Sequence, residues 1–101
     1  MPRIGQDAAA TIGARIRGLR TERLRVTQTD LESMSGIEVA VIRKLEAGKA
    51  MPSLGMIVRL AFALGVDPGE LVKGLRPEDL PAPGIQGPPG LAVARHRRIG
   101  A

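Results

Sequence analysis

Apolar residues recur at intervals of three and four along the first three-quarters of the chain, which is the period of an amphipathic α-helix. The segments that carry this period are separated by short breaks containing glycine, proline or a small polar residue. Aromatic residues make up only 1% of the chain, so its core must be built from aliphatic side chains and methionine. This composition favours helices over sheets. The pattern predicts an all-α protein of five helices.

The first predicted helix follows an arm, residues 1–6, that shows no pattern. Asp7 is a suitable N-cap, and the three alanines after it form helices readily. The helix is expected to run to about residue 23 and to carry one stripe at spacings of four, three and four: Ile12, Ile16, Leu19 and Arg23.

The next two predicted helices are short and meet at a glycine, which is the arrangement of a helix-turn-helix. Thr27 is a good cap for the first of them, with Asp30 in its first turn, and Gly36 ends it. The second helix ends at Gly48. The residues expected to face inward are Leu31, Met34, Ile37, Ile42 and Leu45.

The fourth and fifth predicted helices begin at clear caps. Ser53 starts the fourth, which Gly65 closes. Asp67 starts the fifth with Pro68 at the first helical position, and Gly74 ends it. The expected inward residues are Leu54, Ile57, Val58, Ala61, Leu64, Leu71 and Val72.

The composition changes after residue 75. Prolines and glycines crowd residues 76–90, which predicts a disordered linker, and residues 91–99 contain a basic cluster that is too short for a stable helix alone. We therefore divide the chain into an arm at 1–6, a helical domain at 7–75 and a Pro/Gly-rich basic tail at 76–101.

Charge and composition limit the classes of function. The formal net charge is +5, the sequence pI is near 11.1, and the chain contains no cysteine and one histidine, His96. This excludes a thiolate or clustered-histidine metal site, and no nucleophile, base and orienter set suggests an enzyme. Neither a signal peptide nor an apolar run of membrane-spanning length is present, so a cytoplasmic, nucleoid-associated protein without cofactors is expected.

Five arginines lie within eleven residues that contain a single acid, Glu22. Such a cluster is either a solvated helix face or a set of phosphate contacts, and the two interpretations are about equally weighted. The cluster comprises Arg15, Arg17, Arg20, Arg23 and Arg25.

From Ile12 to Gly74 the chain resembles the lambda-repressor-like (XRE family) helix-turn-helix domain. The matching text is Ile12-Gly13-x-Arg15-Ile16-Arg17-x-Leu19-Arg20, Thr27-Gln28-x-x-Leu31, Ser35-Gly36-Ile37, Ile42-x-x-Leu45-Glu46-x-Gly48-Lys49, Pro52-Ser53-Leu54 and Leu60-Ala61-x-Ala63-Leu64-Gly65-Val66. The spacing departs from the family only by one extra residue, which we place in the connection 24–26, where an insertion is tolerated.

The resemblance implies double-stranded DNA as the partner. Gln28 matches a residue that holds a phosphate at a helix N-terminus, and Lys49 matches a common backbone contact. Glu46 matches a structural residue and is expected to pair with an arginine of the first helix. The full set of implied DNA-contacting residues is Arg20, Thr27, Gln28, Glu38, Val39, Ala40, Arg43, Lys44 and Lys49.

The recognition helix implied by the resemblance has an unusual outer face. Val39 and Ala40 can contact only a thymine methyl group, whereas Arg43 or Lys44 can donate to guanine. Glu38 stands where the family usually has serine, threonine or asparagine, and glutamate is a poor cap that repels phosphate. Modest sequence selectivity per monomer follows.

Phe62, the only aromatic residue, is expected on the outside of the fourth helix. It is either a rim residue folded over the edge of the core or a contact for a second subunit or the tail.

Three functions fit these observations. The first is a transcriptional regulator, most simply a repressor that occupies operator DNA as a weak homodimer. The second is a DNA-binding antitoxin whose residues 76–101 fold on a protein partner. The third is a protein-interaction module that has kept the fold and lost DNA binding, for which the sequence Glu38-Val39-Ala40-Val41 is the motivating feature.

Overall fold

The protein is described by a computed structural model that covers residues 7–82 of the chain. Within these residues the secondary structure is entirely helical, as predicted. The five α-helices are α1 (Asp7–Gly18), α2 (Gln28–Ser35), α3 (Val39–Glu46), α4 (Leu54–Leu64) and α5 (Pro68–Val72).

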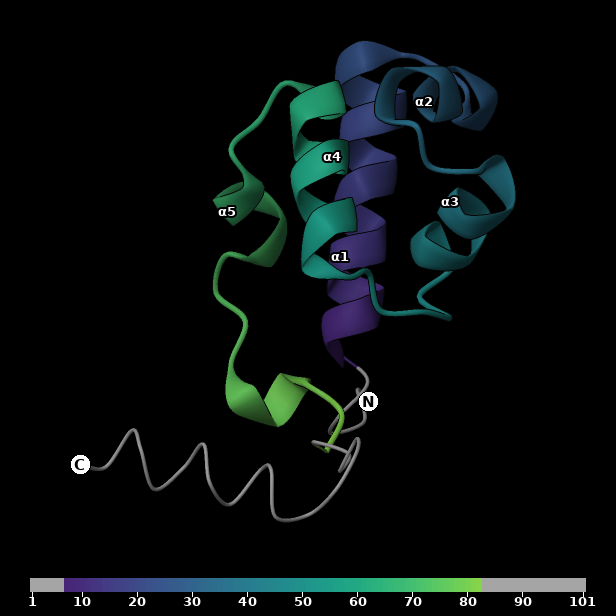
Figure 1. Cartoon of the computed structure of the whole chain (residues 1–101). Coiled ribbons are helices and arrows are strands. Elements are labelled where there is room, and N and C mark those ends of the chain that lie inside the picture. Colours follow the sequence, from purple (N-terminus) through teal and green to yellow (C-terminus); the bar gives the residue numbers. More distant parts are fainter. Residues whose placement is uncertain (1–6, 83–101) are drawn as a thin grey trace, which may run out of the picture.

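The helices are arranged around α1 and α4 (Figure 1). In this view α2 and α3 lie on one side of these two helices and α5 on the other. The contacts agree with the picture, because α1 packs against α3 and α5, while α4 packs against α2 and α5. The helix-turn-helix formed by α2 and α3 is therefore mounted on a scaffold made by the other three helices.

The predicted caps of α4 and α5 are present. The Ser53 hydroxyl accepts a hydrogen bond from the Met56 N–H at 3.1 Å, and the Asp67 carboxylate accepts one from the Gly69 N–H at 2.8 Å. These bonds satisfy N–H groups that have no acceptor inside their own helix. Asp7 itself lies in the first turn of α1 rather than before it.

A glycine allows α1 and α3 to approach each other closely. A Cβ atom on Gly13 would overlap the carbonyl oxygen of Leu45 and would also crowd the backbone of Glu46. Only a residue without a side chain fits there, so the position of α3 against α1 depends on Gly13.

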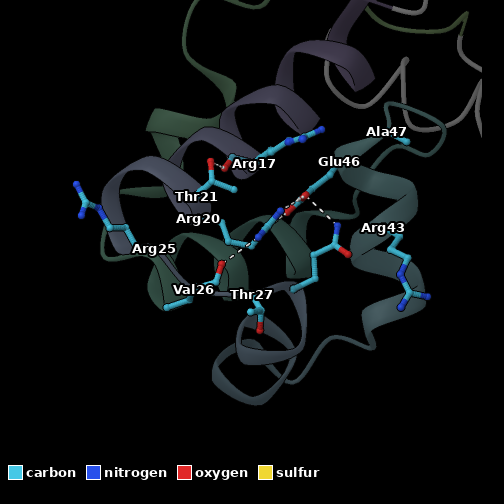
Figure 2. Close-up of a pocket in the computed structure, with 10 residues that line it drawn as sticks. Arg17, Arg20, Thr21, Arg25, Val26, Thr27, Arg43, Glu46 and Ala47 are labelled. Atoms are coloured by element: carbon cyan, nitrogen blue, oxygen red, sulfur yellow. Dashed lines mark hydrogen bonds and ion pairs between the residues drawn. The ribbon is translucent and has the colours of Figure 1, made fainter.

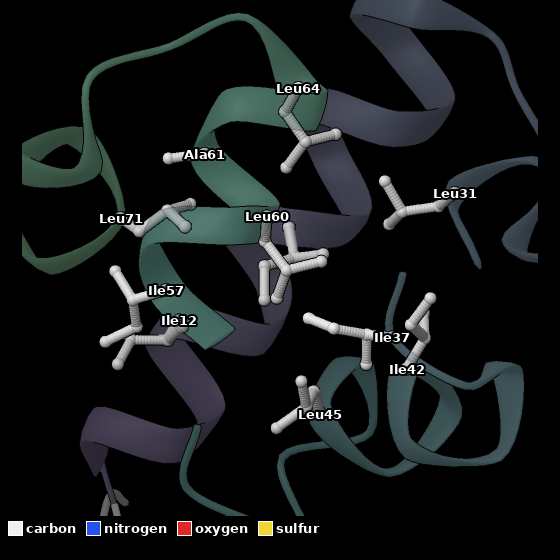
Figure 3. Packing of buried hydrophobic residues seen from close by; sticks show 11 residues of the cluster. Ile12, Leu31, Ile37, Ile42, Leu45, Ile57, Leu60, Ala61, Leu64 and Leu71 are labelled. Carbon is white, nitrogen blue, oxygen red and sulfur yellow. The ribbon is translucent and has the colours of Figure 1, made fainter. Parts of the chain in front are cut away.

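The core is a single aliphatic cluster to which every helix contributes (Figure 3). Most predicted inward residues are buried in it. Its members are Ile12, Ile16, Leu31, Ile37, Ile42, Leu45, Ile57, Leu60, Ala61, Leu64 and Leu71.

Four residues that were predicted to face inward are exposed instead. On α2 the buried position after Leu31 is Ser35, four residues on, and its hydroxyl accepts a hydrogen bond from the Ile37 N–H at 3.1 Å. On α4 the buried stripe is rotated relative to the predicted one. Leu60 is buried, whereas Leu54 and Val58 face outward. On the short α5 only Leu71 reaches the core. The four exposed residues are Met34, Leu54, Val58 and Val72.

The chain between α1 and α2 departs from α-helical geometry. The chain continues from α1 into a π-helical segment, Leu19–Leu24, which accommodates one more residue per hydrogen-bonded turn than an α-helix. Arg25 then ends the segment in the left-handed conformation, with φ of 58°, and its N–H donates to the Arg20 carbonyl. The placement of the extra residue in the connection 24–26 stays a prediction.

Part of the segment predicted as disordered linker has local structure. Pro77–Asp79 forms a single 3-10 turn, and the Arg76 N–H donates to the Asp79 carboxylate at 2.9 Å. Residues 83–101 of the predicted tail, and the predicted arm at 1–6, lie outside the described residues. Among the helices of residues 7–82, none is long and apolar enough to cross a membrane.

Candidate nucleic-acid interface

The N-terminus of α2 is fixed by a reciprocal cap. The Thr27 hydroxyl accepts a hydrogen bond from the Asp30 N–H at 3.0 Å, and the Asp30 carboxylate accepts one from the Thr27 N–H at 2.9 Å. This second bond is the main reason why the pKa of Asp30 lies below its ordinary value of 3.8. The first N–H groups of α2 are therefore presented at a defined helix end, where the helix dipole favours an anion.

Gln28 is oriented by a network that connects three helical segments. The Arg20 guanidinium donates two hydrogen bonds to the Glu46 carboxylate, at 2.7 and 2.9 Å, and a third to the Val26 carbonyl at 2.9 Å. The Gln28 side-chain amide donates to the same carboxylate at 3.0 Å. The expected pairing of Glu46 with an arginine of the first helix is present.

The Arg20–Glu46 pair is shielded from water. The side chains are only 11% and 4% exposed, and the bidentate geometry is the strongest that an arginine and a carboxylate can form. Its hydrogen bonds to Glu46 raise the pKa of Arg20 above its ordinary value. Arg20 was predicted as a DNA contact, but its donors are engaged inside the protein, which gives it the geometry of a positioning residue.

A recess of about 750 Å³ opens beside this network. Figure 2 shows Arg20 directed at Glu46, with Arg25 and Arg43 on opposite sides of the pair. Four arginines against one glutamate give the recess a net positive charge of three. We call it the arginine recess; it is lined by Arg17, Arg20, Thr21, Arg25, Val26, Thr27, Gln28, Arg43, Glu46 and Ala47.

Arg17 and Arg25 were not assigned to the interface from the sequence. The sequence showed a cluster of arginines, but it did not show that these arginines divide between two recesses. Arg15 donates to the Leu71 carbonyl at 3.1 Å and lines a different recess, together with Arg23. The π-helical turn and the left-handed Arg25 determine which arginines reach the arginine recess, and neither feature has a simple sequence signal.

The exposed face of α3 carries the predicted base-reading residues. Ala40 and Lys44 lie one turn apart and are both exposed, while Val39 is half-buried. Arg43 is also exposed and lines the arginine recess, and it lies three residues after Ala40, on the same side of α3. Arg43 thus connects the arginine recess with the exposed face of α3.

Carboxylates occupy the N-terminal end of α3. Glu38 is the exposed N-cap residue, and its side chain makes no capping hydrogen bond, as expected for glutamate. The Glu32 carboxylate of α2 instead accepts a hydrogen bond from the Val39 N–H at 3.2 Å. This end of α3 is consequently satisfied from within the protein rather than left open for an anion.

The two remaining predicted residues lie away from the arginine recess. Lys49 is exposed in the loop after α3, and its N–H donates to the Lys44 carbonyl at 2.9 Å. Phe62 is 80% exposed on α4, so it is not folded over the edge of the core. Among the described residues no group of acidic or histidine side chains is placed to hold a metal ion.

Comparison with known proteins identifies the fold. The profile of the HTH_3 family, described as Helix-turn-helix, matches residues 16–71. The restriction-modification controller protein C.AhdI from Aeromonas hydrophila is 35% identical in sequence over 62% of this chain and 94% of its own, with a TM-score of 0.59. No curated protein sequence matches the chain significantly.

Two further solved structures have the same fold. The P22 c2 repressor, solved in complex with a synthetic operator, is 31% identical over 63% of this chain and 96% of its own, with a TM-score of 0.58. The hypothetical transcription factor NHTF from Neisseria is 23% identical over 78% and 90%, with a TM-score of 0.61, and supports the fold alone. Because the family profile matches more than half of the residues, the chain belongs to the lambda-repressor-like helix-turn-helix family.

Proposed function

We propose that the protein is a DNA-binding transcriptional regulator that represses by occupying operator DNA. The observation that carries the proposal is the position of the arginine recess at the N-terminus of α2, next to the exposed face of α3. Specific binding to a DNA duplex needs both the recess and this face, because phosphate contacts position a protein and base contacts give it specificity.

The phosphate contacts are proposed to come from the recess. Gln28 is oriented by Glu46, so its side chain and the N-terminal N–H groups of α2 receive one phosphate. Arg17, Arg25 and Arg43 surround that position and attract the neighbouring phosphates. Thr27 contributes by fixing the helix end, and Arg20 by holding Glu46.

Base reading is proposed for α3 in the major groove. Lys44 donates to guanine O6 and N7, and Ala40 and the exposed part of Val39 contact thymine methyl groups. Lys49 lies close enough in sequence to α3 to contact the DNA backbone after the helix ends. One strong hydrogen-bonding residue supplies about 1 to 3 kcal/mol of discrimination, so two copies on a two-fold operator are needed for useful specificity.

Selection of bound sites from random DNA tests this function directly. The expected product is a pair of half-sites about one helical turn apart, bound at physiological salt about a thousandfold or more tighter than unrelated DNA. The Lys44→Ala variant should lose preference at particular base pairs, whereas Gln28→Ala should weaken binding to all sequences. Binding without any sequence preference at physiological salt would contradict the proposal.

A second candidate is a protein-interaction module that has lost DNA binding. The observation that favours it is the pair of carboxylates, Glu32 and Glu38, at the N-terminal end of α3, where they repel a phosphate. A chain that binds no DNA in the selection but gains affinity as Glu38→Ser would support this alternative. The antitoxin hypothesis depends on residues 76–101, most of which lie outside the described residues, and it stays a prediction.

A further inference from the structure

The proposed recognition helix, α3, is held firmly at its C-terminal end. The backbone of Leu45 and Glu46 lies too close to Gly13 to admit a Cβ atom there, and the Glu46 side chain is paired with the first helix. The two buried residues of α3 are Ile42 and Leu45. None of the first three residues of the helix is fully buried, so core packing holds its N-terminal turn less firmly.

A side chain of α2 makes a directional contact with that turn. The Glu32 carboxylate accepts a hydrogen bond from the Val39 N–H at 3.2 Å, and both residues are half-buried. The residue that ordinarily bonds to this turn is the N-cap, here Glu38, whose side chain makes no such bond. Among residues 7–82 no other side-chain hydrogen bond reaches the first turn of α3. Glu32 therefore attaches the start of α3 to the middle of α2.

We propose that Glu32 is a specificity-determining residue that acts by positioning the first turn of α3, an inference that rests on the proposed DNA-binding function. Val39, whose N–H carries the bond, and its neighbour Ala40 are the proposed contacts for thymine methyl groups. Alanine has no side-chain torsion and valine is stiff, so neither can follow the DNA if the backbone moves. A gap of about 0.5 to 1 Å already removes about a quarter to a half of a van der Waals contact.

Lys44 depends much less on this attachment. Its side chain is long and flexible, and it leaves α3 near the firmly held C-terminal end of the helix. A shift of the first turn therefore leaves its donors within reach of guanine. Loss of Glu32 should consequently affect the base pairs opposite Val39 and Ala40 and spare the base pair opposite Lys44.

The charge of Glu32 has the opposite effect on general affinity. The carboxylate lies at the N-terminal end of α3, beside the proposed interface, and it repels phosphates whatever the DNA sequence. Removing Glu32 should therefore raise the affinity for all DNA while it lowers discrimination at particular base pairs. A side chain that only stabilised the fold would instead change binding to every sequence in the same direction.

Two variants of the full chain separate the hydrogen bond from the charge. Glu32→Ala removes both, whereas Glu32→Gln keeps an oxygen acceptor and removes only the charge. Both variants should bind unrelated DNA about twofold more tightly than the wild type. Fluorescence anisotropy at physiological salt measures these affinities.

Uracil in place of single thymines of the selected operator tests base reading, because uracil lacks only the methyl group. Opposite Val39 and Ala40 this change should weaken wild-type binding about threefold. The uracil penalty should disappear in Glu32→Ala and remain in Glu32→Gln. A guanine analogue without the N7 acceptor, placed opposite Lys44, should weaken binding of all three proteins equally.

Amide hydrogen exchange of the free protein tests the attachment itself. The Val39 N–H should exchange about fivefold or more faster in Glu32→Ala than in the wild type, and Glu32→Gln should stay close to the wild type. Glu70→Ala is the matched control, because Glu70 is an exposed acid in α5, on the other side of α1 and α4 (Figure 1). It should change neither the exchange of Val39 nor the uracil penalty.

Several results would overturn this role of Glu32. One is a uracil penalty that is absent from the wild type, or equal in the wild type and Glu32→Ala, although the protein selects an operator. Another is unchanged exchange of the Val39 N–H in Glu32→Ala. A third is weaker binding of Glu32→Ala to every duplex in equal proportion, which would leave Glu32 a contribution to folding alone. A wild type that prefers no sequence would overturn the proposed function, and the reading role of Glu32 with it.

Discussion

Arg20 and Glu46, which are 26 residues apart in the sequence, form a bidentate ion pair between the end of the first helix and the end of α3. The same carboxylate accepts the Gln28 amide. One acidic side chain therefore joins the scaffold to both helices of the helix-turn-helix, and it couples the stability of the domain to the orientation of a proposed phosphate-binding residue.

Replacing Glu46 should destabilise the domain strongly. Glu46→Ala leaves the part-buried Arg20 guanidinium without its charged partner, and losing hydrogen bonds to a charged group costs about 1.5 to 3 kcal/mol. Urea unfolding followed by circular dichroism measures the loss. Glu46→Gln, which keeps an acceptor for Arg20, should lose less, and equal losses for the two variants would contradict this account.

Two glycines of the first helix should respond to alanine in opposite directions. Gly13→Ala places a Cβ against the Leu45 carbonyl and should lower the free energy of unfolding by about 1 to 3 kcal/mol. Gly18 has helical dihedral angles and no atom within 4 Å of its would-be Cβ, so Gly18→Ala should raise the free energy of unfolding by up to about 1 kcal/mol. Thermal unfolding of the two variants side by side tests this contrast.

The cap of α2 should make stability depend on pH in the acid range. The folded state lowers the pKa of Asp30, so the stabilisation is fully present above its ordinary value of 3.8 and is lost as the pH falls through the lowered value. Melting temperatures between pH 2 and pH 5 (about the range of carboxyl titration) should therefore fall less steeply for Asp30→Asn than for the wild type. Glu22→Gln, at an exposed acid without a hydrogen bond to a helix end, serves as the control and should follow the wild type.

Arg25 should contribute to DNA affinity without affecting sequence preference. Arg25→Ala removes one proposed phosphate contact, so the slope of log K against log salt should fall by about 0.9. Arg23 is also exposed but lines a recess on another side, so Arg23→Ala should change the slope little. Fluorescence anisotropy titrations over a series of salt concentrations make the comparison, and equal slopes for the two variants would remove Arg25 from the interface.

Glu38→Ser should strengthen DNA binding and also improve the cap of α3. Serine accepts a hydrogen bond from the first turn, which is worth about 0.5 to 1 kcal/mol, and removes a charge that repels phosphate. Both the melting temperature and the affinity should rise. A lower affinity would instead indicate that Glu38 makes a favourable contact, such as accepting from a cytosine amino group.

The fold was predictable from the sequence because its breaks and caps are local signals. Thr27, Ser53 and Asp67 each begin the expected helix, and Gly36 separates α2 from α3. Which apolar residues are buried was less predictable. A helix with apolar residues nearly all round, such as α4, has no unique inner stripe, and its rotation depends on packing between distant segments.

The interface was predictable only in part, for a similar reason. Gln28 and Lys44 have positions that follow directly from where α2 and α3 begin. The pairing of Glu46 with an arginine of the first helix was also predicted. The identity of that arginine as Arg20, and the arrival of Arg25 in the recess, depend on contacts between segments and on a local departure from α-helical geometry.

The π-helical segment Leu19–Leu24 also bears on how this domain tolerates changes in length. One residue removed from that segment would let the helix tighten to ordinary α-helical winding, and Val26 could still enter α2 from the same direction. We therefore expect a single-residue deletion in this segment to change its helical winding rather than the position of α2. The helix-turn-helix itself would stay in register, with its proposed DNA-facing side unchanged.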